Sequence, residues 1–483
     1  MSFTSLRDFL RFLQQKNDLK TITYPIDPHL EVTELSRRVL LKEGPALLFP
    51  KPKGYHYPLL TNLFGSTARI AHALGLADKK ALRALGEELA FLREPSPPKK
   101  IKDALPLVST FFNLHLKKRS APDFDEERLI GKAVDLGRMP IQTCWPKDKA
   151  PLITFGVTIT QNLEGRHNLG IYRLQLLDKN KLIMRWFPHR GGALDFQSWQ
   201  RQNPGKPFPV AVVIGTDPAT LLAAVAPIPN TLSEYQFAAL LRKSRTKVIP
   251  ALSSAMRLPA SFEWVLEGHI DPYEKALEGP FGDHTGYYNE PETHAVFTVT
   301  HMRFQSDAIY HSTYTGRPPD EPALLGEAFN EMLIPLLQKQ FPEIADFYLP
   351  PAAASYRLAL VSIKKSYLGH AKRIMLGIWS YLPQFLYTKG IAIFDDDIDI
   401  RAANDVIWAL ATRVDPKRDM VILDRTPIDH LDFASPEEGL GSKIGVDATT
   451  KWPGESSRHW GEVIAMDETV IKRIDALWAK LEL

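Results

Sequence analysis

The sequence of 483 residues is poor in cysteine, in net charge and in long apolar runs. Its single cysteine, Cys144, excludes an internal disulfide and any zinc or iron–sulfur site that needs several cysteines. Lys and Arg total 59 against 56 for Asp and Glu, and a net charge of +3 is too small to indicate nucleic acid as a partner. Because no run of about 18 uncharged apolar residues occurs, we expect no membrane-spanning helix.

Familiar catalytic motifs are missing as well. The sequence has no GxxxxGK[ST] phosphate loop, no HExxH zinc motif, no strand-borne GxSxG and no CxxC pair. The start, MSFTSLRDFL, lacks the cationic and apolar segments of a secretory signal. With 44% hydrophobic and 24% charged residues, the composition is typical of a globular protein. We therefore expect an intracellular enzyme of about three domains at roughly 150 residues each.

The apolar pattern divides the chain into three parts. Helix and strand signals alternate in residues 1–116, strand signals dominate residues 117–322, and helices and strands alternate again in residues 323–483. We place the first boundary around the proline-rich segment Pro95–Lys100. The predicted fold class is α/β and β multidomain, with an N-terminal α/β domain, a mostly antiparallel barrel-like domain and a C-terminal α/β domain.

Two C-terminal segments carry predictions of their own. Gly439–Trp460 is rich in Gly, Ser and Pro, so we expect it to be irregular. Asp467–Leu483 has apolar residues at helical spacing, which predicts a terminal helix with an apolar stripe. Such a helix must dock, either on its own domain or on a neighbouring subunit, and it could also touch lipid.

One arginine lies among apolar residues in the strand-like segment Asn168–Leu177. Alternation along a single strand would place Arg173 on the same face as Ile171 and Gln175. A desolvated guanidinium needs an anionic partner. Arg173 is thus either half of a structural ion pair or an anchor for a carboxylate or phosphate.

Basic and small residues gather in Met184–Asp195, just before a predicted helix. Arg185, His189 and Arg190 flank the glycines Gly191–Gly192, which would let a ligand approach the backbone closely. The N-terminus of a helix offers free N–H groups and positive potential. The segment suits a phosphate group, and the alternative is an arginine-rich surface turn.

Carboxylates occur at two further places. Glu278 and Asp283 lie in one glycine-rich loop, where we expect coupled protonation that leaves one of them protonated near neutral pH, unless both are simply solvated. Glu234 starts a predicted helix, so it is either a capping carboxylate or a metal ligand. With Asn168 and His189 it would form a set suited to Mn²⁺ or Mg²⁺. Asp395–Asp397 is another possible metal site or a turn at the end of a strand.

Ten short segments occur in a fixed order along nearly the whole chain. They are NLGIYRLQLL, KNKLIMRW, HRGGALD, TLSEY, EGPFGDHTGYYN, IYHSTYTGRPPDEP, DFYLPP, HAKR, TPIDHLDFASP and DATTKWPGE. Each segment alone is a weak signal, but in this order they are very specific. The chain resembles the UbiD family, and within it the bacterial polyprenyl-4-hydroxybenzoate carboxy-lyases of ubiquinone biosynthesis.

This resemblance implies a fold, a reaction and a location. The central domain would be a split β-barrel related to flavin reductases, and the C-terminal domain would carry oligomerisation into a homohexamer. The cofactor would be prenylated FMN, supplied by a separate flavin prenyltransferase, with Mn²⁺ and often K⁺ at its phosphate. The reaction would be non-oxidative decarboxylation of 3-polyprenyl-4-hydroxybenzoate to 2-polyprenylphenol and CO₂, with the cofactor as a covalent electron sink. Since the polyprenyl tail is embedded in lipid, the enzyme would be cytoplasmic and peripherally associated with the inner face of the cell membrane.

The resemblance also assigns residues by motif. In the catalytic network, Arg173 would orient the substrate carboxylate, Glu278 would tune the network and Asp283 would return a proton to the ring carbon. The implied metal ligands are Asn168, His189 and Glu234. The implied cofactor-binding residues are Ile171, Tyr172, Arg173, Arg185, Trp186, Phe187, Arg190 and Gly191.

Two other functions are open at this stage. A decarboxylase of small phenolic or cinnamic acids would carry the same motifs. A non-catalytic flavin-binding component of a quinone-synthesis complex is the second, but the presence of Arg173, Glu278 and Asp283 argues against it. A flavin reductase would need a dinucleotide-binding fingerprint, which the sequence lacks.

Overall fold

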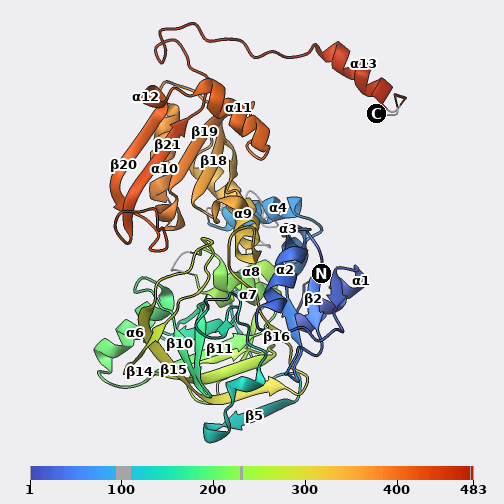
Figure 1. Cartoon of the computed structure of the whole chain (residues 1–483), viewed down its shortest axis with the longest axis vertical. Coiled ribbons are helices and arrows are strands. Elements are labelled where there is room, and N and C mark those ends of the chain that lie inside the picture. The colour runs from blue at the N-terminus through green and yellow to red at the C-terminus, as the bar shows by residue number, and fades with distance from the viewer. Residues whose placement is uncertain (1, 94–109, 229–231, 382, 479, 482–483) are drawn as a thin grey trace.

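The computed structural model describes residues 2–93, 110–228, 232–381, 383–478 and 480–481. The N-terminal and β-rich regions lie next to each other, and the C-terminal sheet lies beyond them, with the long helix α9 (Glu321–Gln340) between (Figure 1). The predicted boundary at Pro95–Lys100 lies outside the described residues. Within the described ranges, no helix is both long and apolar enough to cross a membrane.

The N-terminal region is a small α/β unit. Its helix α1 (Leu6–Gln15) begins where the Ser5 hydroxyl accepts a hydrogen bond from the Asp8 amide, and its apolar face is buried. The other helices are α2 (Glu31–Leu40), α3 (Thr67–Ala73) and α4 (Lys80–Arg93). The sheet has the order β1 (Leu19–Thr21), β2 (Ala46–Phe49), β3 (Leu59–Thr61), β16 (Tyr310–His311). A strand from far along the chain therefore completes this sheet.

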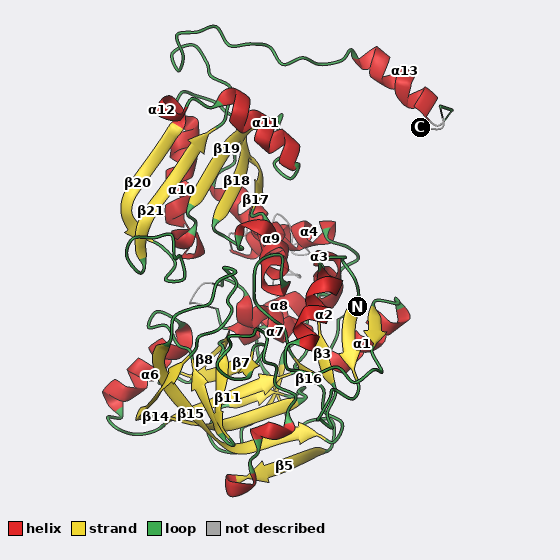
Figure 2. Cartoon of the chain, viewed as in Figure 1, coloured by secondary structure: helices red, strands yellow, loops and turns green. Residues whose placement is uncertain are grey.

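The central region is a curled, mostly antiparallel sheet of nine strands, as the sequence predicts (Figure 2). Its two longest strands, β14 (Trp264–Glu278) and β15 (Glu292–Gln305), pair with each other along most of their length. The remaining strands are β5 (Glu126–Ile130), β6 (Leu152–Ile153), β7 (Val157–Gln161), β8 (His167–Ile171), β9 (Leu174–Asp178), β10 (Lys181–Met184) and β11 (Phe208–Ile214). Helices α6 (Gly191–Gln202), α7 (Pro218–Val225) and α8 (Glu234–Arg242) and a small sheet of β4 (Lys117–Lys118), β12 (Lys247–Pro250) and β13 (Arg257–Pro259) adjoin it.

The prediction of one continuous strand over Asn168–Leu177 is wrong. The segment is two strands, because β8 pairs with β7 whereas β9 pairs with β6 and β10. The change of partner leaves Tyr172 and Arg173 between the strands. Arg173 therefore does not share a strand face with Ile171 and Gln175, and its side chain is free to turn toward the end of β14.

The C-terminal region is an α/β sheet of five strands in the order β17 (Ile344–Tyr348), β18 (Leu358–Ile363), β19 (Gly390–Asp395), β21 (Leu440–Asp447), β20 (Met420–Pro427). Helices α10 (His370–Tyr381), α11 (Ala403–Arg413) and α12 (Pro416–Asp419) accompany it. Strands β18, β19 and β21 are parallel. The prediction that Gly439–Trp460 is irregular is wrong in its first part, since β21 lies inside the sheet.

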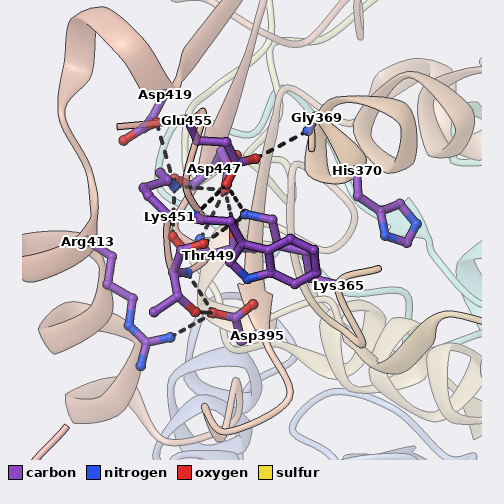
Figure 3. A network of polar contacts seen from close by, with 12 residues as sticks. Lys365, Gly369, His370, Asp395, Arg413, Asp419, Asp447, Thr449, Lys451 and Glu455 are labelled. Atoms are coloured by element: carbon purple, nitrogen blue, oxygen red, sulfur yellow. Dashed lines mark hydrogen bonds and ion pairs between the residues drawn. The ribbon is translucent and has the colours of Figure 1, made fainter. Parts of the chain in front are cut away.

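A polar network closes the carboxyl ends of the three parallel strands (Figure 3). The buried ammonium of Lys451 donates to Asp447 Oδ1 at 3.0 Å, and that of Lys365 donates to Glu455 Oε2 at 2.5 Å. Asp395 and Asp397 both pair with Arg413, at 3.1 and 2.6 Å. The Asp395–Asp397 segment is thus a turn at the end of β19 in which two carboxylates pair with one arginine.

The terminal helix α13 (Glu468–Trp478) ends an extended segment that leads away from the C-terminal sheet (Figure 1). None of its residues is buried, and its apolar side chains Val470, Ile471, Ile474 and Trp478 are 41–56% exposed. The helix forms as predicted, and its described residues do not pack on their own domain. Packing on a neighbouring subunit stays a prediction.

Candidate active site

Arg173 brings together two acids from distant parts of the chain. Its Nε donates to Glu278 Oε1 at 2.7 Å and its Nη1 donates to Asp283 Oδ2 at 2.8 Å. The guanidinium also lies 4.9 Å from the ring centre of Phe281. The side chains of Arg173, Glu278 and Asp283 are 13%, 0% and 11% exposed. The three residues that the sequence singles out therefore form one desolvated network.

Glu278 is the fully buried centre of this network. It ends β14, where the Gln175 side chain accepts a hydrogen bond from the Gly279 amide and holds the turn. A second guanidinium, that of Arg185, donates to Glu278 Oε2 at 3.1 Å. Two guanidinium groups thus share the Glu278 carboxylate, and Arg173 and Arg185 are the groups placed to contact an anionic ligand.

Asp283 is ionised in this network. Burial alone would raise the pKa of its carboxyl, but the charge of Arg173 and hydrogen bonds from His284 outweigh burial and hold the pKa well below its usual range. For Asp283, the expectation of an acid that stays protonated near neutral pH is therefore wrong. The reason is that both carboxylate oxygens face cationic donors, at Oδ2 from Arg173 and at Oδ1 from His284.

Sequence reasoning missed the residues on the far side of Asp283. His284 Nδ1 lies 2.8 Å from Asp283 Oδ1, and His284 Nε2 lies 3.8 Å from Asp429 Oδ2 of the C-terminal domain. Asp429 is also held by Arg357 at 2.9 Å and by the Tyr356 hydroxyl at 3.2 Å. Both His284 and Asp429 stand inside segments that carry the family resemblance, and that was the only signal available.

Asp148 is a second missed residue, and it anchors the loop that carries Asp283. Its Oδ1 accepts from the Gly282 amide at 2.9 Å, and its Oδ2 accepts from the Cys144 and Trp145 amides at 3.0 and 2.8 Å. Any side chain at Gly282 would collide with the Trp145 ring, since a Cβ there would lie 2.2 Å from it. Close packing against Trp145 therefore fixes the acid loop.

The start of α6 forms a tight cradle around small residues. Its N-cap, Arg190, makes no side-chain capping hydrogen bond, and the Gly192 amide donates to the Tyr172 hydroxyl at 3.1 Å. A Cβ on Gly191 would lie 2.0 Å from Asn168 Oδ1, and one on Gly192 would lie 2.9 Å from the Trp186 ring. This helix start has the N–H groups, the adjacent arginine and the close backbone approach that a phosphate site needs.

The predicted metal ligands are only partly assembled. Glu234 Oε2 accepts from the Leu169 amide at 3.0 Å, which places Glu234 next to Asn168, and burial raises the pKa of its carboxyl. The contacts of His189 are instead with Tyr387, at 3.3 Å to the hydroxyl, and with the His430 ring at 6.4 Å. In the described part of the chain, no cluster of three or more His, Cys, Asp or Glu side chains could hold a metal ion.

Asn168 and Glu234 nevertheless have oxygen-rich surroundings. The Asp195 carboxylate accepts from Thr160 at 2.5 Å, and the same Thr160 oxygen accepts from Asn168 at 3.4 Å. Amide and carboxylate oxygens suit Mn²⁺ and Mg²⁺. In addition, the buried Trp186 Nε1 has no hydrogen-bond partner within the described ranges. Asn168 and Glu234 are thus the two predicted ligands that the structure brings together.

Three family models match successive parts of the chain. They are the 3-octaprenyl-4-hydroxybenzoate carboxy-lyase N-terminal domain at residues 10–89, the Rift-related domain at residues 115–318 and the C-terminal domain at residues 323–448. Together these matches span most of the sequence.

Solved structures show the same fold over the full length. The UbiD-class enzyme HmfF from Pelotomaculum thermopropionicum, in complex with FMN, is 28% identical with a TM-score of 0.80, and the match covers 98% of this chain and 99% of that chain. The vanillic acid decarboxylase of Sedimentibacter hydroxybenzoicus is 24% identical with a TM-score of 0.83 over 100% of both chains. With all three domains matched in order and the arginine–acid network in place, the chain belongs to the UbiD family of carboxy-lyases.

Proposed function

We propose that the protein is a prenylated-FMN-dependent decarboxylase of aromatic acids. The observation that carries this proposal is the buried Arg173–Glu278–Asp283 network, which combines an anion-binding guanidinium with a carboxylate that can exchange a proton. Arg173 orients the substrate carboxylate, and Asp283 delivers the proton that replaces CO₂ on the ring. Glu278 holds Arg173 and Arg185 in position and sets the charge of the site.

Direct loss of CO₂ would leave an aryl carbanion with no group to stabilise its charge. Bound prenylated FMN would supply the electron sink that avoids this carbanion. The start of α6, with Arg190 and Gly191, would hold its phosphate, and Asn168 and Glu234 would hold a Mn²⁺ ion beside it, with K⁺ as a second cation. Ile171, Tyr172, Trp186 and Phe187 would line the ring system. A UbiD-class HmfF variant, 26% identical to this chain, is described in complex with prFMN, which supports the choice of cofactor. A flavin prenyltransferase would supply it.

For the substrate we propose 3-polyprenyl-4-hydroxybenzoate, converted to 2-polyprenylphenol. The family description names an octaprenyl substrate of this kind. The exposed apolar face of α13 offers a surface for subunits of a homohexamer or for peripheral contact with the inner face of the membrane. The test is decarboxylation by purified holoenzyme of 4-hydroxybenzoates with long and short prenyl chains, beside small phenolic and cinnamic acids. Turnover of the small acids alone would replace the proposed substrate.

Gly191→Ala tests the proposed cofactor cradle. The new Cβ would fall 2.0 Å from Asn168 Oδ1 and push that amide out of place. We expect the affinity for metal and flavin to drop about 10- to 100-fold, as when other metal-supporting contacts are lost. Flavin absorbance and bound manganese, measured on protein co-expressed with a flavin prenyltransferase, report the effect. Gly461→Ala is the matched control, since its Cβ meets open space; equal loading of both variants would reject the cradle.

A further inference from the structure

The proposed function does not explain how Asp283 regains its proton after each turnover. Decarboxylation takes up one proton per turnover, yet Asp283 rests as a carboxylate between Arg173 and His284. After each delivery it must be protonated again, although its side chain is only 11% exposed. A proton source must therefore lie in contact with it.

His284 is the group in contact. Its Nδ1 lies 2.8 Å from Asp283 Oδ1, and its side chain is 22% exposed, twice the exposure of Asp283. Its Nε2 lies 3.8 Å from Asp429 Oδ2. With Asp283 at hydrogen-bond distance from Nδ1 and Asp429 at ion-pair distance from Nε2, the charged imidazolium is the favoured form of His284. The imidazole is thus placed between solvent and the buried acid.

We infer that His284 returns the proton to Asp283 in each turnover and that Asp429 keeps His284 charged for this role. The inference rests on the proposed decarboxylation. The bond between ring carbon and carboxyl breaks, CO₂ leaves, and the ring carbon takes the proton of Asp283. A proton then passes from His284 Nδ1 to Asp283 Oδ1, and the neutral imidazole takes a proton from water. The net reaction converts one aryl carboxylate and one proton into the arene and CO₂.

The charges around His284 keep its imidazole protonated at rest. Burial by itself would lower the pKa of the imidazole, but the hydrogen bond to Asp283 and the nearby carboxylate of Asp429 raise it to about 10. Asp320, at the N-cap of α9, is a third acid whose charge interacts with His284. Arg173 and Arg357 lie behind the two partner acids and limit the excess of negative charge.

Asp429 also links proton supply to the position of the C-terminal domain. Its loop reaches the barrel at two more places, where His430 stacks on Phe187 with ring centres 5.7 Å apart and Phe433 meets Tyr287 at 6.0 Å. Arg357 and Tyr356 hold Asp429 from the C-terminal side. Any displacement of this loop would remove Asp429 from His284. In this scheme His284 acts on the substrate only through Asp283, which it contacts directly.

The first test compares variants of the full-length holoenzyme. His284→Asn keeps an N–H donor at the Nδ1 position but cannot pass on a proton. We expect kcat to fall about 100-fold with little change in KM, whereas a purely structural role predicts that asparagine restores turnover. His370→Asn removes another buried, ion-paired histidine, outside the acid loop, and should keep the wild-type kcat.

The pH dependence gives a second readout. In the wild type we expect a flat kcat between about pH 6 and pH 9, because His284 stays charged throughout. In His284→Asn the rate should fall about tenfold per pH unit, since Asp283 must then draw its proton directly from solvent. In Asp429→Asn the flat region should end about one pH unit lower. A flat profile and full kcat in His284→Asn would overturn the inference and leave the decarboxylase assignment intact.

A third measurement, of the charge of His284, does not depend on catalytic turnover. A titration of ¹⁵N-histidine-labelled full-length protein, with His284→Gln to identify the signal, reports the charge of His284 directly. We expect an imidazolium at about pH 8 in the wild type and a lower pKa in Asp429→Asn. If no aromatic acid is converted, the proposed function fails and this titration still decides the charge of His284. A neutral His284 at that pH would reject the inference even in an active enzyme.

Discussion

Replacing Asp283 by asparagine should lower kcat for decarboxylation by about 10²- to 10⁴-fold, the usual contribution of a positioned acid. Asparagine has the same shape and can still accept a hydrogen bond from Arg173, so the pocket and the flavin content should be preserved. It cannot deliver a proton to the ring carbon. Product formation by the holoenzyme, with flavin absorbance measured on the same sample, separates loss of chemistry from loss of cofactor.

The matched control is Asp307→Asn, which removes a carboxylate that pairs with Arg7 at 2.8 Å but is 70% exposed. It should leave kcat unchanged. An Asp283→Asn enzyme with the wild-type kcat would remove Asp283 from the chemistry. Loss of flavin in Asp283→Asn would instead assign Asp283 to cofactor binding.

The same substitution has a pH-dependent effect on stability. The pKa of Asp283 is lower in the folded protein than the value of about 3.9 expected when unfolded. Its carboxylate therefore stabilises the fold above about pH 4, and this contribution is lost as the pH falls toward the folded-state pKa. The stability difference between wild type and Asp283→Asn should shrink on acidification.

How much the sequence could predict depends on whether a feature is local. The apolar spacing of residues 6–13 predicts α1 correctly, and the polar turn between Asp178 and Lys181 predicts the β9–β10 hairpin. The sequence did not predict strand β21 because the strand contains Gly441 and Gly445, and glycines are typical of loops. The structure explains Gly445, since a Cβ there would lie 2.5 Å from Met375 Sδ on α10. A close helix-to-sheet contact, invisible in local sequence, requires that glycine.

The active site likewise combines residues that local sequence can predict with contacts that it cannot. Arg173, Glu278 and Asp283 could be named in advance because the arginine stands in an apolar segment and the two acids lie close together in a segment that carries the family resemblance. The break between β8 and β9, which turns Arg173 toward those acids, depends on strand pairing and could not be predicted. The contact of His284 with Asp429 joins two domains, and no spacing rule connects residues so far apart.

Replacing Lys451 by methionine should destabilise the C-terminal sheet by about 3–5 kcal/mol, the cost of breaking a buried ion pair from one side. The Lys451 side chain is 1% exposed, and its ammonium donates to the Asp447 carboxylate at 3.0 Å and to the Thr449 carbonyl at 2.7 Å (Figure 3). Methionine fills the space but leaves the Asp447 carboxylate buried without its cation. Thermal unfolding and amide hydrogen exchange of β21 measure the loss.

Lys472→Met in α13 is the matched control, because Lys472 and Glu468 are also four residues apart but 78% and 86% exposed. An exposed pair of this kind contributes at most about 1 kcal/mol. We therefore expect Lys451→Met to unfold at a clearly lower temperature and to lose amide protection in β21, while Lys472→Met stays close to the wild type. Equal effects of the two substitutions would show that the network at the ends of β18, β19 and β21 does not hold this edge of the sheet together. A large loss confined to Lys451→Met would identify that network as what fixes the loop after β21.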